Sequence, residues 1–307
     1  YDSSTTITTL TDANGGIIKY KNIENLTVGD YTYTEDTSTD TYWNSSEYIL
    51  YMYGGSTTSS SFITDLSGFS ASKNLTVQGS AGNDTMNLNI NRDTTLTGNL
   101  TLNMGAGDDT FNSAKLKNGD SIDMGAGDDS ISIMASGTNG TPTIANLDLT
   151  KLDGGAGSDT LKFEESGSNT TELTLTTGGA TNFENIIGTA GAETIKGDAN
   201  ANILKGKDGA DTLYGYAGND TLYANDTDTG GADDANNYLY GGAGNDTLIS
   251  AQGSDTLDGG TGTDTMTGGS GTDTFIIRVG DGSTTLTNAN VITDFDSNGE
   301  YIGLDNN

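Results

Sequence analysis

Gly-Gly-Ala-Gly-Asn-Asp-Thr-Leu-Ile, at residues 241–249, is the clearest copy of a nine-residue phrase that recurs in this chain. The phrase begins again at Gly206, Gly215, Gly259 and Gly268, with a looser copy at Ser250. Its glycines allow tight turns with positive φ and leave backbone carbonyls accessible. Its aspartate adds an anionic oxygen, and the apolar residue two places later suits a short strand. Because so short a strand cannot bury its own face, we expect the copies to stack on one another.

The sixth position of the phrase recurs every nine residues between 188 and 276, with one break at residues 225–234 that we expect to loop out. Two nonapeptides then make one 18-residue turn with a short strand on each side. Residues two repeats apart meet on the same edge, as Asp246 does with Asp264 and Asp255 with Asp273. In chain order the sixth position is occupied by Glu193, Asn202, Asp211, Asp220, Asn237, Asp246, Asp255, Asp264 and Asp273.

A looser form of the phrase appears between residues 76 and 187. Its aspartates, Asp84, Asp109, Asp129 and Asp159, are 25, 20 and 30 residues apart, with alternating strand-like segments between them. The simplest geometry is one wide coil per interval, with an aspartate loop at one corner of each coil.

The two ends of the chain depart from the repeat. Residues 1–75 are rich in aromatic side chains, and the segment 48–53 reads as a strand. We expect a β cap here, or otherwise an exposed patch for a neighbouring subunit or a sugar. Near the other end, residues 291–296 and 301–304 are expected to form a closing hairpin that covers the edge of the sheet.

These segments predict an all-β fold: a right-handed parallel β-solenoid or β-roll with stacked, glycine-rich aspartate loops. The expected divisions are an aromatic-rich β cap or assembly region at 1–75 and a wide-coil solenoid at 76–187. A tandem nonapeptide roll at 188–276 and capping strands at 277–307 follow.

Composition restricts the function. The 307 residues include 43 acidic and 12 basic ones, for a formal net charge of −31, so nucleic acid and anionic membranes are poor partners. No long apolar stretch predicts membrane insertion. The chain has no cysteine and no histidine, which excludes disulfides and the common nucleophile–histidine pairs. The acid pairs recur with the repeat, which favours metal ligation over acid–base catalysis, and we expect no enzyme activity.

Calcium is the cation that the loops favour, since Ca²⁺ selects carboxylate and carbonyl oxygens. Carboxylates stacked roughly 5 Å apart would repel each other by about 0.8 kcal/mol per pair even in water, so a stack without cations should resist forming. The alternative is that some loops stack without metal and their aspartates only accept hydrogen bonds from backbone amides.

The phrase resembles the Gly-Gly-x-Gly-x-Asp-x-U-x nonapeptide (U apolar) of the RTX, or repeats-in-toxin, family of secreted bacterial proteins. Residues 154–162, 241–249, 259–267 and 268–276 match best, whereas Glu193, Asn202 and Asn237 replace the aspartate, and Met104 and Met124 replace the first glycine. The resemblance implies a parallel β-roll with several Ca²⁺ ions between successive turns. It also implies secretion through a type I export channel and folding in calcium-rich medium. The ligands it implies are Asp84, Asp109, Asp129, Asp159, Asp211, Asp220, Asp246, Asp255, Asp264 and Asp273, with Gly242, Gly244, Gly260, Gly262, Gly269 and Gly271 in the loops.

Three functions remain open. The chain is similar to the lattice-forming part of RTX-type bacterial surface-layer proteins, which predicts an extracellular structural subunit that associates with itself and with a cell-surface polysaccharide. The second hypothesis is the C-terminal region of an RTX adhesin that binds a surface or glycan. The third is the secretion and folding module of an RTX exoenzyme or toxin.

Overall fold

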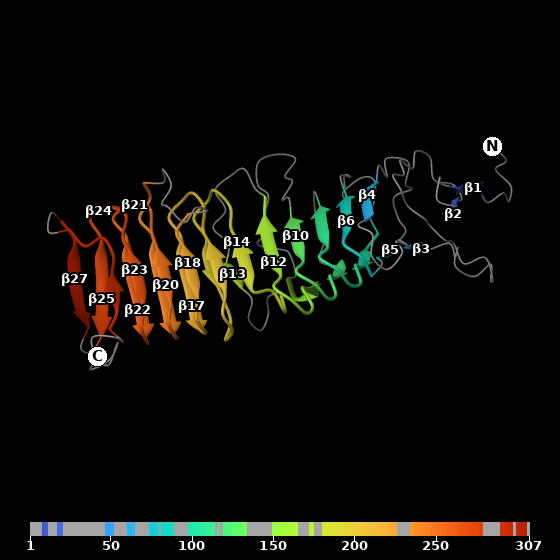
Figure 1. Ribbon diagram of the computed structural model, residues 1–307. Helices are drawn as coiled ribbons and strands as arrows, with labels where there is room; N and C mark the ends of the chain where they lie inside the picture. The colour runs from blue at the N-terminus through green and yellow to red at the C-terminus, as the bar shows by residue number, and fades with distance from the viewer. Residues whose placement is uncertain are drawn as a thin grey trace. The chain divides into compact units, whose positions relative to one another are not determined.

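Short parallel strands separated by glycine-rich turns make up most of the computed structural model (Figure 1). It describes residues 8–11, 17–20, 47–51, 60–64, 74–79, 81–88, 98–113, 116, 119–133, 149–164, 172–174, 180–225, 234–278, 289–296 and 299–305. In most three-residue strands of the tandem repeats, a threonine and the third residue flank one buried apolar side chain, as in Thr247–Ile249 around Leu248. This alternation is the period-two pattern of a half-buried strand.

The chain divides into two compact units, and the first contains residues 1–136 and 146–160. One of its sheets is five-stranded and parallel, in the order β11, β9, β7, β5, β3. The second sheet brings β4, β6, β8 and β10 together in parallel. The bounds are β3 (Glu47–Tyr51), β4 (Ser60–Thr64), β5 (Asn74–Gln78), β6 (Asp84–Leu88), β7 (Leu100–Asn103), β8 (Thr110–Ser113), β9 (Ser121–Asp123), β10 (Ser130–Ile133) and β11 (Leu152–Asp153).

The strand register of this unit follows the aspartate spacing. Leu75 pairs with Leu100, Thr101 with Ser121, and Ile122 with Leu152. These are the same intervals of 25, 20 and 30 residues that separate the aspartates. The prediction of one coil per aspartate interval is therefore confirmed by the register of these strands.

The N-terminal region contains both kinds of pairing. β1 (Thr8–Thr11) and β2 (Ile17–Tyr20) form an antiparallel pair, whereas β3 and β4 already pair in parallel with the next coil. Residues 48–51 of the predicted strand lie in β3. Tyr42 and Trp43, which belong to the aromatic-rich region predicted as a cap or an exposed patch, lie outside the described residues, so that part of the expectation stays a prediction.

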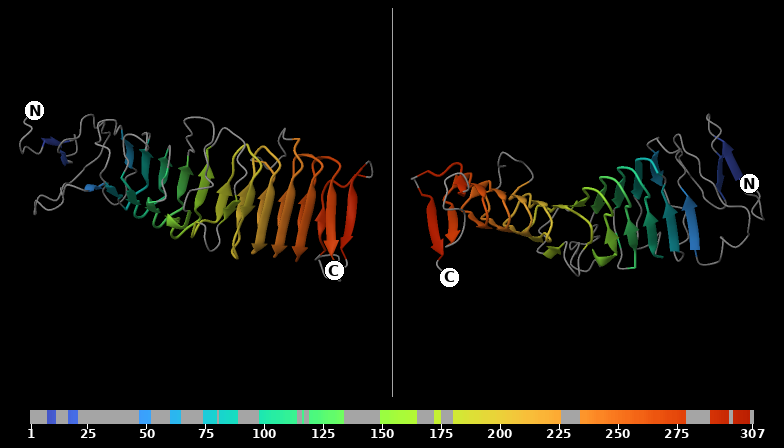
Figure 2. Two further views of the ribbon diagram at one scale, coloured as in Figure 1. Left: turned by 180° about the vertical axis from the view of Figure 1, so that it is seen from behind. Right: turned by 60° about the horizontal axis from the view of Figure 1, so that its bottom comes forward.

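The second compact unit contains residues 137–145 and 161–307, and the unit boundary falls within β12 (Thr160–Phe163). One of its sheets is seven-stranded, in the order β13, β15, β17, β19, β22, β25, β27. A facing row contains β14, β16, β18, β20, β23 and β26, and Figure 2 shows these strands side by side. The bounds are β13 (Glu172–Thr174), β14 (Asn185–Ile187), β15 (Thr194–Lys196), β16 (Ile203–Lys205), β17 (Thr212–Ala217), β18 (Thr221–Tyr223), β19 (Tyr238–Ala243), β20 (Thr247–Ile249), β22 (Thr256–Thr261), β23 (Thr265–Thr267), β25 (Thr274–Arg278), β26 (Val291–Ile292) and β27 (Tyr301–Asp305), with a small pair of β21 (Gln252–Gly253) and β24 (Ser270–Gly271).

The core of the second unit is a thin double row of side chains. Leu213, Leu239, Leu257 and Phe275 are in register on one sheet and are fully buried. Their counterparts in the facing row, among them Leu222, Leu248 and Met266, are also fully buried. Each such side chain contributes roughly 1.5–3 kcal/mol of burial free energy, and the eighth position of the nonapeptide supplies it in every turn.

The predicted closing hairpin was wrong. β26 pairs in parallel with β23, and β27 pairs in parallel with β25. The two segments therefore join different sheets and extend the stack by one more turn. The stack is still held at this end by Asp294, whose carboxylate accepts hydrogen bonds from the amides of Gly268 and Gly269 at 3.0 and 2.7 Å.

The described residues contain a single helical turn, the 3₁₀ turn η2 (Leu149–Lys151). No helix among them has the length and apolar character needed to cross a membrane.

Candidate metal centre

The glycines of the loops adopt backbone conformations that other residues avoid. All six loop glycines named from the sequence have positive φ, from 83° at Gly260 to 151° at Gly244. The turns also approach each other closely, since a Cβ built on Gly260 would lie 2.0 Å from the carbonyl oxygen of Gly242. Only glycine satisfies both conditions. The six are Gly242, Gly244, Gly260, Gly262, Gly269 and Gly271.

The ten aspartates predicted as ligands form buried ladders. Each is at most 2% exposed. A carboxylate oxygen of one turn accepts a hydrogen bond from the backbone amide of the corresponding residue in the preceding turn. Examples are Asp109 N–H to Asp129 Oδ1 at 2.6 Å and Asp220 N–H to Asp246 Oδ1 at 2.8 Å. The full set is Asp84, Asp109, Asp129 and Asp159 in the first unit, and Asp211, Asp220, Asp246, Asp255, Asp264 and Asp273 in the second.

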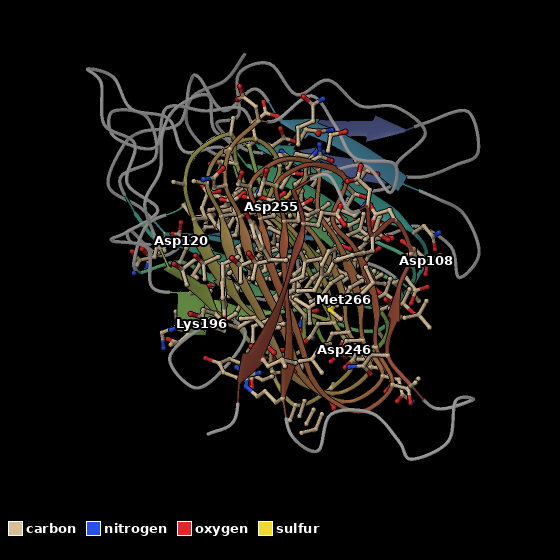
Figure 3. The ribbon with its side chains drawn as sticks, turned by 90° about the vertical axis from the view of Figure 1, so that its left-hand side faces the viewer. Asp108, Asp120, Lys196, Asp246, Asp255 and Met266 are labelled. Atoms are coloured by element: carbon tan, nitrogen blue, oxygen red, sulfur yellow. The ribbon has the colours of Figure 1, made fainter. Side chains whose placement is uncertain are left out.

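The tandem aspartates follow two separate edges. On one edge Asp220, Asp246 and Asp264 succeed one another without interruption. On the other edge Asn237 stands between Asp211 and Asp255, and Asp273 follows. In the end-on view of Figure 3, Asp246 and Asp255 lie toward opposite edges and Met266 lies in the interior. The predicted meeting of residues two repeats apart is confirmed.

The second oxygen of these carboxylates distinguishes a cation site from a purely structural bond. The Oδ2 atoms of Asp109, Asp129, Asp220, Asp246 and Asp273 are buried and accept no hydrogen bond from the protein. A buried ionised oxygen without a partner is strongly unfavourable. The hydrogen-bonding alternative therefore accounts for one oxygen of each of these five side chains and leaves the other to a cation or a proton.

Backbone carbonyls lie next to these oxygens. A Cβ built on Gly215 would be 2.3 Å from Asp220 Oδ2 and 2.6 Å from the carbonyl oxygen of Gly241 in the next turn. At Gly241 the equivalent distances, to Asp246 Oδ2 and the carbonyl oxygen of Gly259, are 2.5 and 2.7 Å. Carboxylate and carbonyl oxygens thus gather where the first glycine leaves space, and this donor set fits Ca²⁺. Among the described residues no three acidic side chains converge on one point, so such a site must use carbonyls.

The local electrostatics disfavour ionised carboxylates in the absence of a cation. Burial raises the pKa of Asp109 to about 8, of Asp246 to about 7, and of Asp129 and Asp220 to about 6. Neighbouring aspartates add to the rise, and the hydrogen bond from the adjacent turn opposes it. Burial also raises the pKa of Asp273.

The three departures at the sixth position have internal partners for their side chains. Both carboxylate oxygens of Glu193 accept hydrogen bonds from Thr189, one from the amide and one from the hydroxyl. Asn202 accepts from the Asp198 amide at 2.8 Å. Asn237 accepts from the Asp211 amide and donates to the Ala235 carbonyl. These loops are therefore chemically different from the aspartate loops.

Met104 and Met124, which replace the first glycine, are both fully buried. The wide coils thus accommodate a large side chain where the tandem roll has glycine. The sequence showed the substitution but gave no sign that the coil interior would accept it.

Sequence reasoning also missed an outer ladder and a tyrosine cluster. The fifth-position residues form the outer ladder, in which Asp128 N–H donates to Asp108 Oδ1 at 3.0 Å and Thr263 N–H to Asn245 Oδ1 at 2.9 Å.

The tyrosine cluster lies on β17 and β19, with ring centroids of neighbours 6.0–6.1 Å apart. Arg278 lies over one of these rings and pairs with the buried Asp258. The cluster comprises Tyr214, Tyr216, Tyr238 and Tyr240. The two tyrosine pairs lie far apart in the sequence, and the 26-residue register between β17 and β19 brings them together.

Comparison with known proteins agrees with the loop chemistry. A search of curated proteins gave no match. A family model described as the RTX calcium-binding nonapeptide repeat matches four copies, at residues 76–98, 187–222, 225–257 and 240–275. These matches cover the first wide-coil loop and the tandem region. Those residues of the chain therefore carry RTX calcium-binding nonapeptide repeats.

Proposed function

We propose that the chain is an extracellular calcium-binding structural protein, a subunit of a bacterial surface layer whose folding and assembly require Ca²⁺. Under this proposal the ten ladder aspartates and the loop carbonyls hold several ions between successive turns. The calcium-binding part of the proposal rests on buried carboxylate oxygens that have no protein partner. They belong to Asp109, Asp129, Asp220, Asp246 and Asp273. A divalent cation would neutralise them without opening the stack.

Under this proposal Ca²⁺ binding is coupled to folding, because the ligands come from different turns and are brought together only in the stack. Chelation with EGTA is expected to abolish the β-sheet circular dichroism signal, and added Ca²⁺ to restore it. An unchanged spectrum in EGTA contradicts this coupling.

The lattice role is supported by the spread of aspartate loops over both units, since a secretion module needs only a compact tandem roll. Negative-stain electron microscopy of the protein in millimolar Ca²⁺ is expected to show two-dimensional sheets. Persistent monomers under the same conditions contradict the surface-layer role while leaving calcium binding intact.

An adhesin is the second candidate, favoured by the tyrosine cluster of β17 and β19. Tyr216 is 42% exposed, and aromatic rings with a polar end are suited to stacking on sugar rings. A glycan array, read with the wild type and a Tyr216→Ala variant, tests it. Glycan binding that is lost in the variant favours the adhesin.

A further inference from the structure

The first tandem turn, residues 188–205, closes its loops in a different way from the aspartate turns. In the loop 188–193, Thr189 donates from its amide to Glu193 Oε2 at 3.2 Å and from its hydroxyl to Oε1. In the loop 197–202, Asp198 N–H donates to Asn202 Oδ1 at 2.8 Å, and Asn202 Nδ2 donates back to Asp198 Oδ1 at 3.3 Å. Each loop is thus closed between its second and sixth positions by the protein itself.

The backbone at the second position separates these two loops from most of the aspartate loops. In the loops that carry Asp211, Asp220, Asp246, Asp264 and Asp273 the second residue has positive φ, even where it is not glycine: φ is 82° at Lys207 and 75° at Tyr216. Ala251, in the loop that carries Asp255, is the exception. Thr189 and Asp198 are not among the described residues with positive φ. Their amides are consequently directed at the sixth-position side chain, as the hydrogen bonds show.

The charge distribution changes at the same place. Lys196, Lys205 and Lys207 lie in or directly after this turn, whereas Arg278 is the only basic residue beyond Lys207. Burial raises the pKa of Glu193, and both the Thr189 hydrogen bonds and the charge of Lys207 oppose that rise. Protein donors and a lysine thus surround the one carboxylate at the sixth position in this turn.

We infer that the turn 188–205 is closed by protein donors in place of a cation, so that Glu193 and Asn202 bind no Ca²⁺ and the calcium-binding sixth positions of the tandem roll begin at Asp211 and Asp220. The inference rests on the proposed calcium function of the aspartate loops. It divides a row of similar repeats into a metal-independent first turn and the metal-dependent turns that stack on it.

The test compares two nearly isosteric substitutions in the full chain, Glu193→Gln and Asp246→Asn. The number of bound Ca²⁺ ions is measured by equilibrium dialysis, and the midpoint of calcium-induced folding by circular dichroism. Glu193→Gln is expected to leave the count unchanged and the midpoint within about twofold, whereas Asp246→Asn lowers the count by at least one. A lower count in Glu193→Gln overturns the inference while the proposed function stands. An unchanged count in Asp246→Asn overturns the proposed function and the inference with it.

A gain of binding provides the second test. Thr189→Gly combined with Glu193→Asp completes the nonapeptide phrase in the loop 188–193. This double variant is expected to bind one more Ca²⁺ than the wild type. A folded double variant with the wild-type count overturns the inference, because the loop would then be metal-free for a reason other than its internal closure.

Discussion

The two oxygens of each ladder carboxylate lie in different surroundings. Asp246 Oδ1 accepts a hydrogen bond from the Asp220 amide at 2.8 Å, whereas Oδ2 is buried without a protein partner. One side chain therefore serves both the register of the stack and, under the proposed function, the cation. Replacing the aspartate with asparagine separates the two roles, because the asparagine side chain keeps the oxygen that accepts the hydrogen bond and removes the negative charge.

Asp246→Asn is expected to shift stability in opposite directions with and without calcium. In EGTA the variant should be more stable than the wild type, because a buried charge next to Asp220 and Asp264 is removed. In saturating Ca²⁺ it should be less stable by about 1–3 kcal/mol. Guanidinium denaturation measures the stability in Ca²⁺. Because EGTA is expected to unfold the wild type, refolding by the stabilising osmolyte TMAO measures the stability in EGTA. The exposed Asp208→Asn carries the same charge change and should leave both values within about 0.5 kcal/mol.

The raised pKa values predict an unusual pH dependence for the calcium-free protein. The pKa is about 8 for Asp109, which faces Asp84, Asp108 and Asp129, and about 7 for Asp246. A folded-state pKa above the unfolded value means that the protonated form is favoured by folding. The stability is then fully present below about pH 4 and is lost as the pH rises through 7 to 8.

Circular dichroism of the dialysed, calcium-free protein between pH 4 and 8.5 measures this dependence. The β-sheet signal should fall as the pH rises. In Ca²⁺ the stability should instead rise with pH, because protons and cations compete for the same carboxylates. A calcium-free β-sheet signal that grows with pH contradicts the prediction.

Gly260 combines a positive φ with a close approach of the preceding turn, although Lys207 and Tyr216 show that the second position of other loops can carry a side chain. Gly260→Ala should destabilise the calcium-loaded protein by at least 1–3 kcal/mol, approximately the cost of a strained backbone residue. The new Cβ would have φ near 83° and lie 2.0 Å from the Gly242 carbonyl oxygen. Gly303→Ala is the control, since its Cβ would meet neighbours only at 3.7 Å or more. Equal melting temperatures for the two variants contradict this explanation.

At the scale of the strands, the sequence predicted what the repeat itself encodes. The 18-residue turn, the two edges of aspartates and the buried eighth position all follow from one phrase. The repeat does not encode the pairing of the C-terminal strands. A turn-like segment between residues 291–292 and 301–305 is compatible both with a hairpin and with one further turn of the stack. Their pairing with β23 and β25 depends on which sheet edge remains open. Likewise, the sequence shows only that Glu193 and Asn202 replace the aspartate, and the Thr189 and Asp198 hydrogen bonds reveal an alternative closure.

The two-repeat turn makes deletions sensitive to their length. Removing residues 250–267 takes out 18 residues, the offset between Asp246 and Asp264 on one edge. β25 should then pair with β19 and place Phe275 over Leu239. Removing only residues 259–267 moves the following strands to the opposite sheet. The first deletion should keep a cooperative calcium-induced transition with fewer bound ions, and the second should lose stability at the C-terminal end. Equal stability of the two deletions contradicts the 18-residue turn.

Charge is the dominant property of the whole molecule. A formal net charge of −31 over 307 residues resists any compact state. Monovalent salt screens charges that are separated by more than about 8 Å at physiological ionic strength. It cannot provide a partner for a buried oxygen such as Asp273 Oδ2, so we expect ion-specific folding and not a general salt effect.

Small-angle X-ray scattering in EGTA with three added salts separates the two effects. Without added divalent salt, the radius of gyration should approach the value for an unfolded chain of this length, on the order of 60 Å. NaCl at matched ionic strength should reduce it only slightly. MgCl₂ should also be a poor substitute, because Mg²⁺ requires near-octahedral geometry and retains its waters, whereas Ca²⁺ accepts irregular sets of carbonyl and carboxylate oxygens. Only CaCl₂ in excess of the chelator should compact the chain in a single sharp transition. Equal compaction by NaCl would show that screening alone folds the stack, and the loop carboxylates would then have no specific cation to bind.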